Sequence, residues 1–101
     1  MPITDYRTVQ TWIHSAHFDD PAPRLEQLEA FCTRVERTPD EMIEDCLKLV
    51  QEGQFKLKGK TRRRYVEEIE AFEGVDGRRR GNVIRSFFIH NGIPIQPPII
   101  T

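Results

Sequence analysis

Apolar residues recur at spacings of three and four along most of this chain, the pattern of amphipathic helices. This spacing predicts a short leading helix over residues 4–15 and longer helices over residues 23–37 and 61–73. It also predicts a last helix that ends near residue 91. In the second helix the apolar stripe consists of Leu25, Leu28, Phe31, Cys32 and Val35.

A further helix is predicted by the four residues TPDE. Thr38 can cap the helix, Pro39 suits its first position, and Glu41 can reach back to the Thr38 amide, which together make a capping box. Gly53 offers a left-handed stop at the other end. The inward side of this helix is expected to carry Met42, Ile43, Cys46, Leu47 and Val50.

Two segments are not predicted to be helical. QFKLKGK, residues 54–60, alternates for a few positions but is short and basic, so we interpret it as a loop. IPIQPPII, residues 93–100, is expected to be extended, with little for its apolar residues to bury against. The prediction is an all-α fold, a bundle of four main helices plus a short N-terminal one. It comprises a domain over residues 1–93 and an extended proline-rich linker over residues 94–101.

Composition limits the size and setting of this fold. The 101 residues are enough for one domain with a single modest core. No run approaches the roughly 20 apolar residues of a membrane span, and no secretory signal is visible. Cys32 and Cys46 fall within amphipathic patterns and are interpreted as small core residues without a disulfide. We expect a cytoplasmic protein without a membrane partner.

The charges are divided unevenly between the two halves. Residues 1–53 hold five Lys/Arg against eleven Asp/Glu, whereas residues 54–101 hold ten against five. Such a chain can present one positive face although its net charge is only −1.

Most of the cations of the second half stand where helices are predicted to begin, as the triplets RRR at residues 62–64 and 78–80. Cations are disfavoured there, because the aligned peptide dipoles already make a helix N-terminus positive. One interpretation is a solvated surface in which Arg63 pairs with Glu67, and Arg64 with Glu68. A second is phosphate binding, as in nucleic acids. A third is a basic surface for an acidic protein partner.

Other candidate chemistry is weak. His14 and His17 lie three residues apart, but no second pair at zinc spacing follows them. The carboxylates Asp19 and Asp20 fit turn chemistry in a proline-rich loop. No phosphate-cradling glycine loop, nucleophile elbow or paired-carboxylate motif is present. We therefore predict no catalytic residues, no metal and no cofactor in this chain.

Two segments, RLEQLEAFCTRVERTPDEMI and GNVIRSFFIHNGIPI, resemble the N-terminal core-binding domain of phage-type integrases, the tyrosine site-specific recombinases. The resemblance extends from about residue 9 to residue 95. Its later element, an aromatic pair followed by Asn-Gly, is matched by Ile84, Arg85, Phe87, Phe88, Asn91, Gly92 and Ile93.

The resemblance implies a small SAM-like helical fold that forms half of a clamp around double-stranded DNA and contacts other recombinase protomers. The other half of the clamp is a catalytic domain that acts through a phosphotyrosine link. This chain does not carry that domain, so we expect no strand-transfer activity from it. Tyr6 and Tyr65 lie in helical core patterns and are not candidate nucleophiles. The proline-rich tail lies where the interdomain linker of the family would be.

The resemblance also indicates which residues would contact DNA. Asn82 and Arg85 are the only ones that could read bases. The full candidate set is Lys58, Lys60, Arg62, Arg63, Arg64, Arg78, Arg79, Arg80, Asn82 and Arg85.

Two alternatives stay open: a helical protein-interaction module with a basic face, and a regulator that binds DNA without a catalytic domain. A DNA clamp requires that the two arginine-rich helix starts share one face, about a groove width apart.

Overall fold

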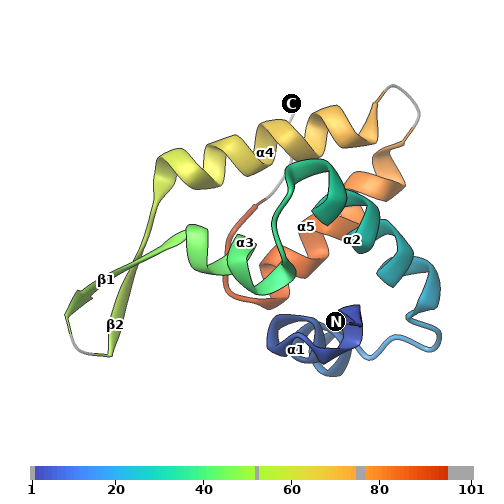
Figure 1. Cartoon of the computed structure of the whole chain (residues 1–101), viewed down its shortest axis with the longest axis horizontal. Helices are drawn as coiled ribbons and strands as arrows, with labels where there is room; N and C mark the ends of the chain where they lie inside the picture. The colour runs from blue at the N-terminus through green and yellow to red at the C-terminus, as the bar shows by residue number, and fades with distance from the viewer. Residues whose placement is uncertain (1, 52, 75–76, 96–101) are drawn as a thin grey trace, which may run out of the picture.

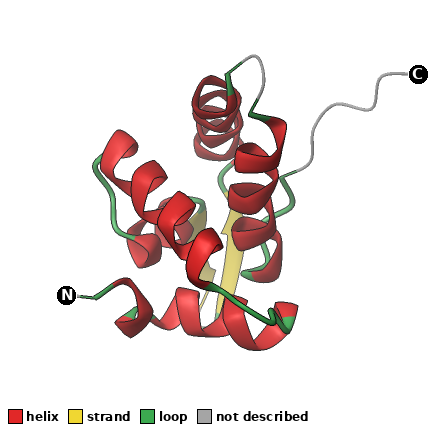
Figure 2. Ribbon diagram, turned by 90° about the vertical axis from the view of Figure 1, so that its right-hand side faces the viewer, coloured by secondary structure: helices red, strands yellow, loops and turns green. Residues whose placement is uncertain are grey.

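The computed structural model describes residues 2–51, 53–74 and 77–95, and five α-helices and one β-hairpin form within them (Figures 1 and 2). A 3-10 turn at Ile3–Asp5 precedes the first helix. The elements are α1 Arg7–Ala16, α2 Ala22–Val35, α3 Pro39–Asp45, β1 Leu47–Gln51, β2 Gln54–Leu57, α4 Gly59–Glu73 and α5 Arg78–His90.

Helix α5 lies at the centre of the molecule and packs against α1, α2 and α4 (Figure 1). Its two adjacent phenylalanines face different neighbours. The Phe87 ring meets the edge of Trp12 from α1, with centroids 5.5 Å apart. The Phe88 ring lies 5.3 Å from Tyr65 of α4. All four side chains are buried, as the apolar stripes predicted, so the helical part of the expectation is confirmed.

The region after α3 differs from the expectation. The helix ends at Asp45, and residues 47–51 pair with residues 54–57 as an antiparallel hairpin. The interpretation of residues 54–60 as a loop, and of Leu47 and Val50 as helical positions, is therefore wrong. Gly53 adopts φ +78° within the hairpin turn instead of ending a helix. The fold is mainly helical with a small two-stranded sheet.

The closing segment contributes to the core up to residue 95. Ile93 and Ile95 are both fully buried, so the expectation that this segment has little to bury against is wrong for these residues. The Arg62 Nη1 donates to the Pro94 carbonyl at 3.0 Å, which attaches the segment to α4. The rest of the predicted linker, residues 96–101, lies outside the described residues.

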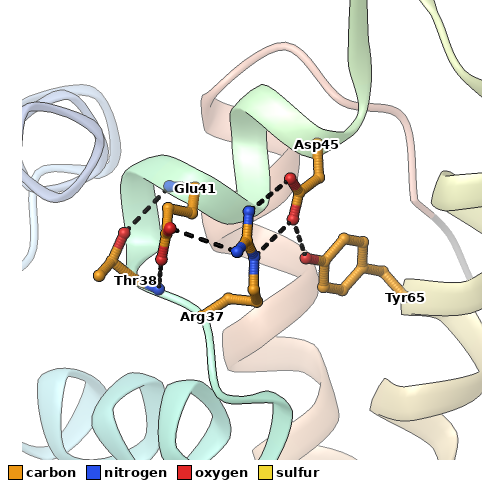
Figure 3. Close-up of polar contacts among 5 residues, drawn as sticks. All are labelled: Arg37, Thr38, Glu41, Asp45 and Tyr65. Carbon is orange, nitrogen blue, oxygen red and sulfur yellow. Dashed lines mark hydrogen bonds and ion pairs between the residues drawn. The ribbon is translucent and has the colours of Figure 1, made fainter.

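A polar network joins the end of α3 to α4 (Figure 3). The predicted capping box is present, because Glu41 N donates to Thr38 Oγ1 at 3.1 Å and Thr38 N donates to Glu41 Oε1 at 2.9 Å. Arg37 donates two hydrogen bonds to the Asp45 carboxylate, at 2.9 and 2.7 Å. The Tyr65 hydroxyl donates to the same carboxylate at 2.8 Å, so one aspartate fixes α3 against α4 just before the hairpin.

Candidate nucleic-acid interface

The two arginine-rich helix starts lie at opposite ends of α4 (Figure 1). Helix α4 is 15 residues long, about 22 Å at 1.5 Å per residue. Helix α5 begins beside the far end of α4, where Gly77 lies against the Glu73 carbonyl. The arginine triplet of α4 begins three residues into the helix, so Arg63 and Glu73 lie ten residues apart, about 15 Å along the helix axis, which is close to the major-groove width of about 12 Å.

The α4-start cluster comprises Lys58, Lys60, Arg62, Arg63 and Arg64. Four of these side chains are exposed, and Arg62 is half-buried. Within the described part of the chain, no carboxylate forms an ion pair with any of the five. The first turn of α4 also contains no acidic residue.

The ion pairs Arg63–Glu67 and Arg64–Glu68, which would make this cluster an ordinary charged surface, do not form among the described residues. Glu68 accepts instead from Arg34 of α2, with Arg34 Nε 3.3 Å from Glu68 Oε2. Arg64 is thereby left without its expected partner. Arg63 has no bond to Glu67, which is itself exposed one turn further along α4. Lys58, Lys60, Arg63 and Arg64 are therefore exposed without an ion pair to a described carboxylate, although Glu67 lines the same hollow as Arg63 and Arg64.

The α5-start cluster, comprising Arg79 and Arg80, has more structural support. Arg80 lies over the Phe72 ring, 4.0 Å from its centroid, and its Nε donates to Gln27 Oε1 at 3.1 Å. Arg79 is exposed and forms no ion pair with a described residue. The side chain of Arg78 lies outside what the structure describes.

Both arginines of the α5-start cluster line a shallow cleft of about 650 Å³ between α2 and α5. Arg24 lines it from the first turn of α2, and its guanidinium lies 4.3 Å above the Phe18 ring. Sequence reasoning missed Arg24, although it repeats the same signal. The first turn of α2 contains this arginine and no acidic residue.

Arg85 does not belong to this surface. Its side chain is 5 % exposed and forms a two-pronged ion pair with Glu73, at 2.8 and 3.0 Å. Arg85 Nη1 also donates to Asn82 Oδ1 at 2.9 Å. The prediction that Arg85 reads bases is wrong for this conformation, because its donors are used inside the fold. Asn82 stays exposed at the edge of the cleft, with its amide oxygen engaged.

Two glycines allow α4 and α5 to approach at this junction. A Cβ atom on Gly81 would overlap Glu73 Oε2 and lie 2.8 Å from Arg85 Nη1. A Cβ atom on Gly77 would overlap the backbone carbonyl oxygen of Glu73. The start of α5 thus packs closely against Glu73, whose carboxylate compensates Arg85, two turns further along the helix.

The outward side of α4 between the two clusters carries negative charge. Glu67 and Glu70 are both exposed there, one and two turns after Arg63. The molecule therefore presents two separate basic clusters at the ends of α4, and not one continuous stripe.

The remaining candidate groups, the tyrosine, the cysteines and the possible metal ligands, do not form a site among the described residues. Tyr65 is buried, and burial together with its bond to Asp45 raises the pKa of its hydroxyl. Burial raises the pKa of Cys32 to about 12 and that of Cys46 to about 11, and both are free thiols. Among residues 2–51, 53–74 and 77–95 no three His, Cys, Asp or Glu side chains lie together as metal ligands. No helix in these ranges is long and apolar enough to cross a bilayer.

Comparison of the chain with protein-family models, with curated proteins and with solved structures finds no match.

Proposed function

We propose that this chain is a DNA-binding module of a tyrosine-type site-specific recombinase, with a SAM-like helical fold that grips duplex DNA through its phosphates. The observation that carries the proposal is the α4-start cluster. Four exposed cations stand at a helix N-terminus, and no described carboxylate pairs with them. Phosphate oxygens would supply the missing negative charge, and arginines bind them with two donors at once.

The spacing of the two clusters determines how such a module would lie on DNA. The ten residues from Arg63 to Glu73 span about 15 Å along α4, which corresponds to about four base pairs at 3.4 Å per step. The clusters would therefore contact phosphates on successive stretches of the duplex. Phosphate contacts position a protein without reading sequence. Sequence selection by this chain would depend on Asn82, since Arg85 is held inside the fold.

The integrase resemblance supports the same proposal through the core of α5. The matched aromatic pair, Phe87 and Phe88, is buried at the centre of the fold. Asn91 donates to the carbonyls of Thr8 and Phe87, and Gly92 adopts φ +87° after the helix. These residues have structural reasons to be present, so the resemblance concerns the scaffold more than the contacts. Strand cleavage would involve a catalytic domain outside this chain, whereas this module would itself contribute contacts with further recombinase protomers.

The proposal is tested by titrating the protein against a mixed-sequence duplex of about 25 base pairs between about 50 and 200 mM salt, by fluorescence anisotropy. Binding should weaken steeply with salt. Arg63→Ala should lower the slope of log K against log salt by about one unit, as expected when one phosphate contact is lost. Arg34→Ala removes an exposed cation of α2 that Glu68 already compensates and is the matched control, with little change in slope expected.

One observation favours a different partner. Exposed Glu67 and Glu70 limit the basic surface to a short cluster, which a short acidic protein segment could cover, whereas a duplex presents phosphate along its whole length. Absence of duplex binding at about 50 mM salt would contradict the DNA proposal and favour this helical protein-interaction module.

A further inference from the structure

We propose that the β1–β2 hairpin is a second DNA-contacting element, whose lysine face continues the α4-start cluster along the phosphate backbone. This inference rests on the proposed function. It adds a surface that the helix starts do not include, and it assigns a role to Lys48 and Lys56.

The register of the hairpin brings these lysines together. Lys48 pairs directly with Lys56, between the pairs Leu47–Leu57 and Leu49–Phe55. Successive residues of a strand point to opposite faces, so the two lysines share one face, opposite Leu47, Phe55 and Leu57. Both lysines are exposed. Like charges directly opposite each other destabilise a strand pair, so the sheet itself gives no reason for this arrangement.

Lys58 extends the same face toward α4. It lies two positions after Lys56, and its backbone is extended at φ −85° and ψ 101°. Its amide donates to the Cys46 carbonyl at 2.7 Å, which continues the pairing of the two strands for one more residue. Lys58 and Arg64 then line the same hollow of about 510 Å³ at the base of the hairpin, which Glu36, Asp45 and Glu68 also line. Asp45 and Glu68 are already paired with Arg37 and Arg34, so Lys58 connects the lysine face of the hairpin to the α4-start cluster.

The opposite face anchors the hairpin only at its base. Leu47 and Leu57 are half-buried and pack against the core, whereas Phe55 is 64 % exposed. The outer part extends away from the helices (Figure 1). A two-stranded hairpin alone is marginally stable in water, so this extension has little structural justification. Five residues at about 3.3 Å each give a reach of about 17 Å, or about five base pairs.

A simpler function for edge lysines is to prevent pairing with other sheets. That function requires charge on exposed strands but no anionic partner. It predicts that loss of the lysines promotes self-association and leaves DNA binding unchanged. DNA contact predicts the reverse, so the two explanations separate in one experiment.

The experiment compares Lys48→Ala/Lys56→Ala with Lys48→Arg/Lys56→Arg in the same duplex titration, with size-exclusion chromatography of each variant. The alanine pair should lower the salt slope by about two units, because each lost phosphate contact contributes about 0.9. The arginine pair keeps both charges and should retain the slope. Unfolding of both variants should match the parent protein, since the substituted side chains are exposed.

The inference is overturned if Arg63→Ala lowers the slope while the alanine pair does not, and the proposed function then survives alone. Self-association of the alanine pair with unchanged DNA binding would identify the lysines as protection of the sheet edges. If the parent protein does not bind the duplex at all, both proposals fail together.

Discussion

The starts of α4 and α5 share one sequence pattern, three arginines where a helix begins, but they differ in what surrounds those arginines. At the start of α5, Arg80 stacks on Phe72, and the later Arg85 is buried against Glu73. At the start of α4, Arg63 and Arg64 are exposed, and no described carboxylate pairs with them. The α5 start is therefore partly a feature of the core. At the α4 start only Arg62, which bonds to the Pro94 carbonyl, is partly buried, and the other two arginines belong to the surface.

The difference teaches that basic residues at a helix start are not by themselves evidence of binding. Residues of other elements can hold such an arginine in place, as the Phe72 ring and the Gln27 amide hold Arg80. Only cations that lack such contacts are free to bind a partner. By this criterion the α4 start is the stronger candidate of the two for phosphate contact.

The largest effect that separates the two starts should come from Arg85→Ala. Removing one partner of a buried ion pair leaves the other charge uncompensated and costs about 3 kcal/mol or more. Arg63→Ala should change the free energy of unfolding by less than about 0.5 kcal/mol, because its side chain is exposed. Urea denaturation of both variants measures the comparison.

A control for that prediction removes both charges together. Arg85→Ala/Glu73→Ala should recover part of the lost stability, since no buried charge is left without a partner. A loss of under about 1 kcal/mol for Arg85→Ala alone would mean that the pair is not buried in solution, and the contrast between the two starts would disappear.

The second effect concerns the glycines that open the two helices. A Cβ atom at Gly77 would overlap a backbone carbonyl, so Gly77→Ala must shift the junction and should cost about 2 kcal/mol. A Cβ atom at Gly59, the first residue of α4, meets nothing within 4 Å. Gly59→Ala should be neutral or stabilise by up to about 1 kcal/mol, because it restricts the unfolded chain. Equal thermal denaturation midpoints for the two variants would contradict the tight junction.

What the sequence predicted well depends on short-range chemistry. The capping box of Thr38 and Glu41 involves residues three apart, and it is present as expected. The buried positions of α4 and α5, such as Ile69 and Phe87, follow from helical spacing alone. These features need no information about the rest of the chain.

What the sequence analysis missed depends on ion-pair partners that are distant in the chain or on hydrophobic patterns that fit two structures. Leu47 and Val50 fit a helical stripe, while Leu47 and Leu49 alternate as in a strand, so the hairpin could not be separated from a longer α3 by periodicity alone. Arg85 pairs with a residue twelve positions earlier, across a turn, where no i, i+4 rule applies. Glu68 binds Arg34 from another helix, 34 positions away, for which no local signal exists.

A third effect, a loss of folding stability at low pH, is expected from the polar network that joins α3 to α4 beside the α4 start. Burial alone would raise the pKa of Asp45, but the hydrogen bonds from Arg37 and Tyr65 outweigh it and lower that pKa. The bond from the Thr38 amide lowers the pKa of Glu41. Both carboxylates therefore stabilise the fold fully above their unfolded pKa of about 4, and this contribution is lost as pH falls through the lower folded values.

Urea denaturation between about pH 6 and pH 3 should show this loss. Asp45→Asn should lower stability by about 1.5 kcal/mol at neutral pH, as for hydrogen bonds to a charged group, and should lessen the dependence on pH. Glu70→Gln, at an exposed position on α4, is the matched control and should change neither. An unchanged pH profile in Asp45→Asn would count against the network of Figure 3.

The smallest effect separates two neighbouring arginines at the start of α5. Arg80→Ala removes the contact with Phe72 and the bond to Gln27, so it should reduce stability by about 0.5–1 kcal/mol. Arg79→Ala removes only an exposed charge and should leave stability unchanged within about 0.5 kcal/mol.

If DNA lies across this end of α4 as proposed, each variant should also lower the salt slope by about one unit. A loss of slope in Arg79→Ala without loss of stability would place a dedicated contact at this start as well. If Arg80→Ala lowers stability but neither variant changes the slope, DNA contact would be restricted to the α4-start cluster.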